Sequence, residues 1–201
     1  MKNIDTIGVL AFGSLISAPC VELAAAEIKQ VRVRTPFPVE FARYSKSRCG
    51  APTLVPVTKG GCRVKAEIIV LSPDVSLIEA KNMLWRRETH QVSSGKTYSP
   101  RRSRNAVRVR ETKGLGGIDR VLYTDFYAAS KIRVLKPRNL GRKAISSARL
   151  NRDGKDGITY LLRAKQYGIR TPLMKKYEAE VLELTETRSL RDALAKVQER
   201  A

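Results

Sequence analysis

Strand-like segments come before helical ones in this chain, and that order constrains its fold more than any other feature of the sequence. Between residues 7 and 127, apolar and β-branched residues occur in short runs bounded by glycine or proline, the pattern of β-strands. In the last third, apolar residues recur with helical spacing. Strands followed by helices favour an α+β fold with one mostly antiparallel sheet or barrel. At 201 residues the chain is long enough to form this as one domain over residues 1–201.

The individual elements follow from the same patterns. We predict strands over residues 7–12, 31–33, 37–44, 53–57, 63–71, 106–110 and 120–127, with a short helical turn over 24–28. Ser72-Pro73-Asp74 is a helix-start signal, and the helix that it predicts ends near Glu88. Its apolar stripe contains Leu77, Ile78, Leu84 and Trp85. After a long loop over 89–105, later helices are predicted around 158–168, from Thr171-Pro172 and from Ser189.

The chain is strongly basic, with 39 Lys and Arg against 19 Asp and Glu and a formal charge of +20. Such a charge favours an anionic partner: nucleic acid, a phosphate-rich surface or a small acidic substrate. Residues 86–113 contain nine basic and two acidic residues, and residues 131–152 contain eight basic and none acidic. Interleaved with Tyr98 and Tyr123, these runs could follow a nucleic-acid backbone. A basic face that is merely solvated is the alternative, because no RNA-binding signature accompanies the runs.

Other residue classes point away from several kinds of protein. Cys20, Cys49 and Cys62 are an odd number without paired spacing, which indicates reduced thiols and a cytoplasmic location. With one histidine and no clustered cysteines, we expect no metal site. The apolar run over residues 7–16 is interrupted by Gly13 and Ser14, so we interpret it as a buried strand rather than a secretory signal. No other stretch approaches the roughly 20 apolar residues of a membrane span, so no membrane partner is expected.

Phe12-Gly13-Ser14-Leu15 is the first candidate for a site, because it follows the first predicted strand directly. A glycine here lets the backbone turn sharply and present successive N–H groups to an anion. The alternative is an ordinary turn at the end of a strand.

Glu88 is the second candidate. It lies four residues after Leu84 and eleven after Leu77, which places it on the apolar stripe of its helix. A carboxyl group there either finds hydrogen-bond donors or favours its neutral form, and a carboxyl that takes up and returns protons can act as a general acid/base. The alternative is a helix-end ion pair with Arg86 or Arg87. His90, two residues further on, is either a partner base or a solvated loop residue.

Taken in order, these segments resemble the γ-glutamylcyclotransferase-like superfamily, including its ChaC-type branch. The members begin with a strand ending in Tyr-Gly-Ser-Leu or Tyr-Gly-Ser-Asn, which is similar to Phe12-Gly13-Ser14-Leu15. The other similar segments are Phe41-Ala42-Arg43-Tyr44-Ser45, Arg48-Cys49-Gly50-Ala51-Pro52, the glycine-led strand 61–71, Arg87-Glu88, Ser94-Gly95-Lys96-Thr97-Tyr98, Leu140-Gly141 and Tyr160-Leu161-Leu162.

The resemblance implies a small, mostly antiparallel or mixed β-barrel with flanking helices. It also implies an enzyme of the transferase or lyase type that cleaves a γ-glutamyl amine or peptide to 5-oxoproline and a free amine, without a cofactor. By the same resemblance, Glu88 is the acid/base, and the substrate-binding residues are Phe12, Gly13, Ser14, Leu15, Tyr98 and Tyr123. The alternative function is a non-catalytic protein of the same fold that binds nucleic acid or another polyanion.

Three positions depart from the family pattern. Phe12 stands where the family commonly has tyrosine, and Ile16-Ser17-Ala18 lacks the glycine that usually follows. Thr89-His90-Gln91 replaces the Gly-Tyr that follows Arg-Glu in ChaC enzymes. The motifs therefore indicate the fold rather than the substrate, and they do not select glutathione.

Overall fold

The structure is a computed structural model that describes residues 5–100, 106–127, 131–151 and 153–199. It contains two compact units, each assembled from segments that are separated in the sequence. Unit 1 comprises Met1–Pro36 and Lys65–Ser130, and unit 2 comprises Phe37–Val64 and Lys131–Ala201. The single domain over residues 1–201 stays a prediction.

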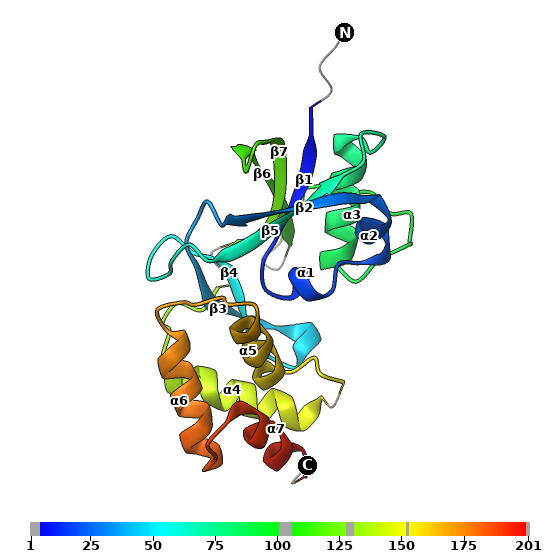
Figure 1. Ribbon diagram of the computed structural model, residues 1–201. Coiled ribbons are helices and arrows are strands. Elements are labelled where there is room, and N and C mark those ends of the chain that lie inside the picture. Colours follow the sequence, from blue (N-terminus) through cyan, green and yellow to red (C-terminus); the bar gives the residue numbers. More distant parts are fainter. Residues whose placement is uncertain (1–4, 101–105, 128–130, 152, 200–201) are drawn as a thin grey trace. The chain divides into compact units, whose positions relative to one another are not determined.

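Unit 1 is built on a five-stranded sheet in the order β2-β5-β1-β7-β6 (Figure 1). Its strands are β1 (Ile7–Ala11), β2 (Glu27–Arg34), β5 (Lys65–Leu71), β6 (Val107–Leu115) and β7 (Ile118–Phe126). The β1–β7 pair is parallel and the other pairs are antiparallel, so the sheet is mixed. The predicted strands in this unit are therefore confirmed, although β2, β6 and β7 are longer than their apolar runs.

The central strand β1 is buried on both faces, as its continuous apolar run predicts. Val9, Leu10 and Ala11 are at most 1% exposed. Gly8 allows the neighbouring strand to approach, because a Cβ atom at this position would lie 2.4 Å from the Ile68 Cγ2 atom.

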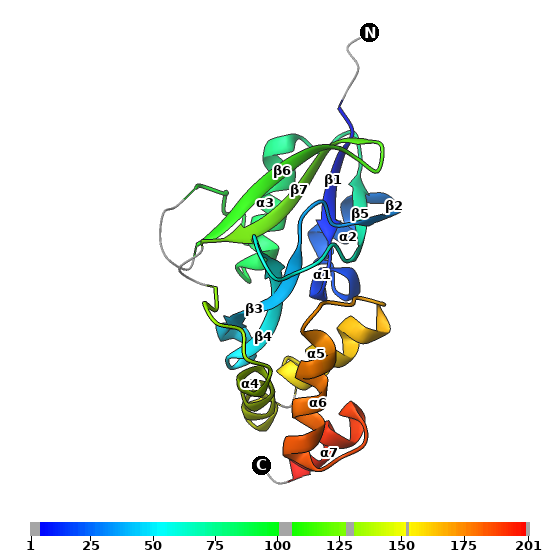
Figure 2. The ribbon, with the colours of Figure 1, turned by 90° about the vertical axis from the view of Figure 1, so that its left-hand side faces the viewer.

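The sheet curls without closing, so the predicted barrel is wrong in that respect. Gly116 and Gly117 form the two-residue turn between β6 and β7, with φ values of 62° and 76°. This turn lies against β2: a Cβ atom on Gly116 would meet the Val33 Cγ1 atom at 2.9 Å. Yet β2 and β6 remain the two edges of the sheet (Figure 2). Exposed Lys29 and Arg32 on β2 are typical of an edge strand that does not pair further.

One face of the sheet is covered by α2 (Val21–Ala26) and α3 (Leu77–Glu88). Helix α3 begins at Leu77 rather than at the predicted Ser72. Ser76 is its N-cap, and the Ser76 hydroxyl accepts a hydrogen bond from the Glu79 N–H. Ser72 instead donates its hydroxyl hydrogen to Asp74 in a separate turn before the helix. Ile78 is 73% exposed and lies off the buried stripe.

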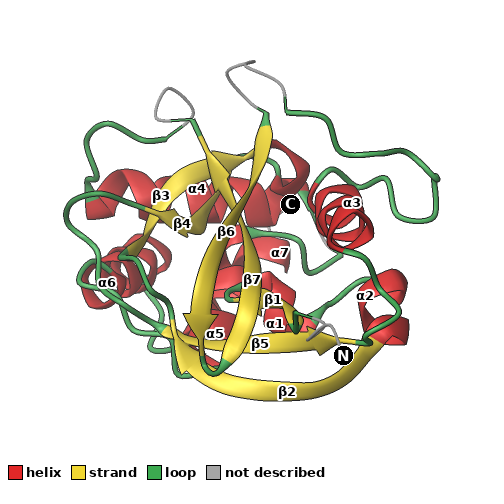
Figure 3. Ribbon diagram, turned by 90° about the horizontal axis from the view of Figure 1, so that it is seen from above, coloured by secondary structure: helices red, strands yellow, loops and turns green. Residues whose placement is uncertain are grey.

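Unit 2 combines the hairpin β3 (Val39–Ser45)–β4 (Ala51–Pro56) with four helices (Figure 3). These helices are α4 (Pro137–Leu150), α5 (Gly157–Gln166), α6 (Met174–Thr185) and α7 (Leu190–Glu199), and a 3-10 turn, η1 (Lys46–Arg48), joins the strands. Helices α4 and α5 contact β4, while α6 and α7 pack on these two helices.

The start of α6 is set by a buried carboxylate. Thr171-Pro172 was predicted to begin this helix, but the Thr171 hydroxyl donates to the Glu40 carboxylate at 2.6 Å. The other Glu40 oxygen accepts from the Leu173 N–H at 3.0 Å, so Glu40 caps the helix from β3. The predicted cap of α7 is confirmed, since the Ser189 hydroxyl accepts from the Asp192 N–H.

Within the described residues, no helix has both the length and the apolar character that crossing a membrane requires. Cys20, Cys49 and Cys62 form no disulfide.

Candidate active site

The turn after β1 is built on Gly13. Its φ of 62° and ψ of −130° lie in a region that is essentially restricted to glycine. The chain then enters a short helix, α1 (Ser14–Ser17), which the sequence did not predict. The first N–H groups of a helix have no partner inside it. The sharp turn predicted at Gly13 is therefore confirmed, while the binding of an anion there stays a prediction.

Glu88 is the last residue of α3, and the buried face of this helix packs on the core of unit 1. Leu84 and Ala80 are fully buried in a cluster that also contains Val9, Leu15 and Leu23. Since Leu84 and Glu88 are one turn apart, the end of the helix is directed toward the segment that carries Leu15. Glu88 thus follows a buried residue of its helix by one turn, as its spacing predicts, and its role as an acid/base stays a prediction.

Arg87 joins Glu88 to the Gly13 turn. One Nη atom of Arg87 donates to a Glu88 carboxylate oxygen. The other donates to the Ser14 hydroxyl at 3.4 Å and to the Ala18 carbonyl at 3.1 Å. The side chains of Arg87 and Glu88 are 15% and 18% exposed, so this ion pair is largely shielded from water. The helix-end ion pair considered for Glu88 is present, and it also links α3 to α1.

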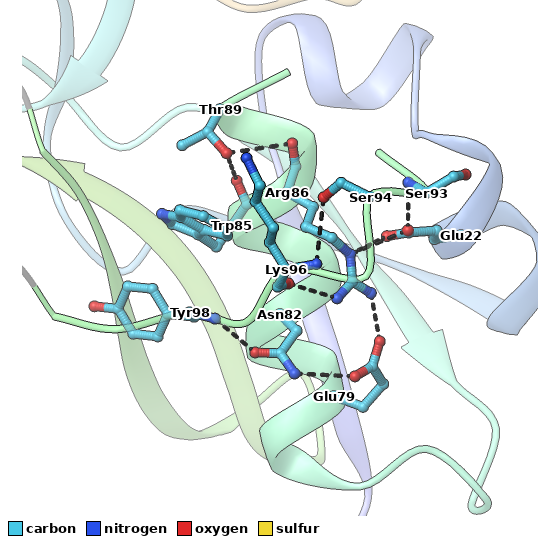
Figure 4. Close-up of polar contacts among 10 residues, drawn as sticks. All are labelled: Glu22, Glu79, Asn82, Trp85, Arg86, Thr89, Ser93, Ser94, Lys96 and Tyr98. Atoms are coloured by element: carbon cyan, nitrogen blue, oxygen red, sulfur yellow. Dashed lines mark hydrogen bonds and ion pairs between the residues drawn. The ribbon is translucent and has the colours of Figure 1, made fainter. Parts of the chain in front are cut away.

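Arg86, which precedes Arg87, makes a different set of contacts, all of them with α2, α3 and the loop after α3 (Figure 4). Its side chain is 6% exposed, and its Nε atom lies 3.0 Å from both carboxylate oxygens of Glu22 on α2. Its remaining nitrogens donate to a Glu79 oxygen and to the Lys96 carbonyl. Although burial opposes the effect, the hydrogen bonds to Glu79 and Glu22 raise the pKa of Arg86. This arginine therefore ties α2, α3 and the loop after α3 together.

Tyr98 belongs to the same scaffold. Its N–H donates to the Asn82 amide oxygen at 2.8 Å (Figure 4). Its hydroxyl accepts from the Val109 N–H at 3.2 Å. The Trp85 ring packs beside it at 6.4 Å between centroids. Tyr98 thus braces the loop against α3 and β6, and its contact with a substrate stays a prediction.

Tyr123 lies on the other face of the sheet. Its neighbour Leu122 belongs to the core cluster under α3, and successive side chains of a strand point to opposite faces. Burial and the nearby Asp125 raise the pKa of Tyr123. The structure does not bring Tyr123 to the side that carries α3, and its predicted role in binding stays untested.

The remaining candidates are accounted for as follows. Phe12 is half-buried between β1 and Gly13. The Leu15 side chain is 5% exposed and lies in the core cluster, so only the backbone of Leu15 is available to a ligand. His90 is exposed and has a left-handed φ of 56° just after the end of α3, which is typical of a helix-ending position. Among the residues that the structure describes, no three His, Cys, Asp or Glu side chains gather as a metal site would require.

The protein has the γ-glutamylcyclotransferase-like fold. A crystal structure described as a γ-glutamyl cyclotransferase specific to glutathione, from yeast, matches 90% of this chain and 99% of its own, with a TM-score of 0.52. The two sequences are 10% identical, so the likeness establishes the fold. No family model matches the sequence, and no curated protein matches it significantly.

Proposed function

We propose that this protein is a cyclotransferase that converts a γ-glutamyl amine or peptide into 5-oxoproline and a free amine. The observation that carries the proposal is the Arg87 bridge. It ties the Glu88 carboxylate, the candidate acid/base, to Ser14 in the candidate anion-binding turn. The resemblance of the motifs and the likeness of the fold support the same reaction class.

In the proposed reaction, Glu88 first takes up a proton as a base and then returns it as an acid. Its carboxylate takes a proton from the α-ammonium group of the substrate, and the resulting amine attacks the γ-carbonyl carbon. A ring C–N bond forms, and the original C–N bond of the γ-amide breaks. Glu88 then returns this proton to the leaving nitrogen. The ring nitrogen gives its second proton to water as the lactam forms, and the released amine takes up one proton from water, so the protons balance without a cofactor. Because the attacking amine and the carbonyl belong to one molecule, holding them in contact supplies much of the rate.

The Gly13 turn supplies the second element of the proposal. The N–H groups at the start of α1 would hold the substrate carboxylate or the oxyanion that forms on the γ-carbonyl. Arg87 is a positioning residue in this scheme, since it contacts both Glu88 and Ser14 and orients the carboxylate. Phe12 supplies no hydroxyl, so the turn relies on backbone donors.

A substrate panel tests the proposal. Purified protein is incubated with γ-glutamyl amino acids, γ-glutamyl amines and glutathione, and 5-oxoproline is measured by mass spectrometry. The matched controls are the α-glutamyl isomers, which have no γ-amide to cleave. We expect at least one γ-glutamyl compound to yield 5-oxoproline and its free amine in equal amounts. No release from any compound in the panel would contradict the proposal.

A further inference from the structure

Positive charge is unevenly divided between the two units. Unit 2 contains 23 Lys and Arg against 9 Asp and Glu, which gives a formal charge of +14 out of the +20 of the whole chain. Unit 2 carries none of the residues proposed above for catalysis. Its charge therefore needs an explanation that is separate from the reaction.

Within unit 2 the charge concentrates in the two segments that contain β3, η1, β4 and α4. Residues 37–64 and 131–151 contain 12 Lys and Arg and a single acidic residue, Glu40. Glu40 is 0% exposed, and its carboxylate is held by Thr171 and Leu173, so it cannot offset charge at the surface. These two segments therefore contribute no exposed carboxylate to the surface of unit 2.

The outer face of α4 is the longest part of this surface. Leu140, Ala144 and Ala148 are fully buried and fix the inner face. Arg142 and Arg149 are exposed and lie seven residues apart, so both point outward on one stripe. Neither forms an ion pair with any residue that the structure describes.

The stripe continues toward the β3–β4 hairpin, which lies beside α4 (Figure 2). The Lys143 Nζ atom lies 5.9 Å from the centroid of the Tyr44 ring on β3, and no carboxylate of the described residues forms an ion pair with it. Exposed Lys46 follows Tyr44 by two residues. At the opposite border, Arg138 contacts Glu180 and Glu183 of α6, and the basic surface ends there.

Helix α6 shows what an ordinary solvated face looks like in the same unit. It mixes Lys175 and Lys176 with Glu178, Glu180 and Glu183. Like charges on one surface repel and lower stability, so mixed signs suffice where solubility is the only requirement. The unmixed surface of α4, β3 and η1 thus indicates binding of an anion.

We infer that this surface, formed by α4, β3 and η1 and called here the α4 face, binds the phosphate backbone of a nucleic acid. From Lys136 to Arg149 the basic residues span about 20 Å at roughly 1.5 Å per residue, which suits an extended polyanion better than one small acid. A membrane surface would require apolar side chains turned outward. Helix α4 turns its apolar residues inward, apart from Leu150 at its end.

The test measures binding of a fluorescein-labelled 20-nucleotide RNA by fluorescence anisotropy over a salt series. The face variant is Arg142→Ala/Lys143→Ala/Arg149→Ala. The control variant, Lys175→Ala/Lys176→Ala/Arg191→Ala, removes the same charge from exposed positions of α6 and α7. We expect the face variant to weaken binding by about tenfold or more and to lower the slope of log K against log salt by about 2, since each lost phosphate contact removes about 0.7.

The control variant should bind the RNA within about threefold of wild type, and both variants should keep the wild-type melting temperature within a few degrees. Equal weakening in both variants would show that net charge alone attracts the RNA and would overturn the inference. So would an unchanged face variant, or binding to phosphatidylserine vesicles without binding to RNA. Release of 5-oxoproline is measured separately, so the inference and the proposed function fail independently.

Discussion

Arg86 provides the sharpest prediction about what holds unit 1 together. Arg86→Met keeps much of the side-chain volume but removes the hydrogen bonds that Arg86 donates to Glu22, Glu79 and the Lys96 carbonyl. Breaking a buried ion pair by removing one partner typically costs about 3–5 kcal/mol. Two features reduce that cost here. Glu79 is 42% exposed and can be rehydrated, and Glu22 still accepts the Ser93 N–H at 2.7 Å.

We therefore expect Arg86→Met to lower the free energy of unfolding by about 2–4 kcal/mol. For a chain of this size that corresponds to a melting temperature lower by roughly 5–15 °C. Urea unfolding measures the energy. Limited proteolysis measures how accessible the loop over residues 89–100 is. Cleavage there should become faster, because the Lys96 carbonyl loses its hydrogen bond from Arg86.

Arg120→Met is the matched control for this prediction. Arg120 also pairs with a carboxylate, that of Glu111, but its side chain is 31% exposed. Solvent screening limits such a pair to about 1 kcal/mol or less. The role assigned to Arg86 is refuted if the free energy of unfolding of Arg86→Met lies within about 0.5 kcal/mol of the wild-type value. It is also refuted if Arg120→Met lowers the free energy of unfolding as much as Arg86→Met does.

Three further predictions concern the Gly13 turn, the start of α3 and the buried Glu40. Gly13→Ala forces a side chain into a glycine-only conformation, so stability should fall by about 1–3 kcal/mol in urea unfolding, with lower turnover; wild-type behaviour would contradict the assigned backbone. Ser76→Ala should lower the free energy of unfolding by about 1 kcal/mol and Ser72→Ala by less. A larger loss for Ser72→Ala would indicate that the helix begins at Ser72 instead. Burial raises the pKa of Glu40 above its ordinary 4.5, so the stability it contributes is greatest at acidic pH and is lost as the pH rises through the folded-state value. The unfolding free energy of wild type minus that of Glu40→Gln should therefore decrease from pH 4.5 to pH 8, and a constant or rising difference would count against this.

Local patterns predicted much of this fold. The β1 strand followed from its apolar run, and the position of Glu88 followed from its spacing to Leu84. The start of α3 did not, because Ser72-Pro73-Asp74 and Ser76 both have the residue types of a helix start. The structure decides between them, because the Ser76 hydroxyl accepts the Glu79 N–H and so caps the helix. Helix α4 was not singled out, although Leu140, Ala144 and Ala148 have helical spacing within the basic run.

Long-range contacts could not be predicted in the same way. Barrel closure depends on pairing between β2 and β6, which no local pattern specifies. Arg86 requires Glu22, 64 residues away, and nothing near either residue signals the pair. The Arg87–Glu88 ion pair is one of the alternatives that the sequence offers, but adjacent residues of a helix do not face each other, so helical spacing does not select it. Arg87 also contacts Ser14 and Ala18, which lie 73 and 69 residues earlier in the chain.

The measurement that tests the central claim most directly is 5-oxoproline release by wild type and Glu88→Gln on the accepted substrate. Glutamine keeps an oxygen that can accept from Arg87, so we expect a loss of stability of about 1–2 kcal/mol at most. It cannot take up and return the proton, so kcat should fall by about 100-fold or more. Glu183→Gln, at an exposed position of α6, should leave turnover unchanged. Equal turnover by wild type and folded Glu88→Gln would contradict the assignment of Glu88 as the acid/base.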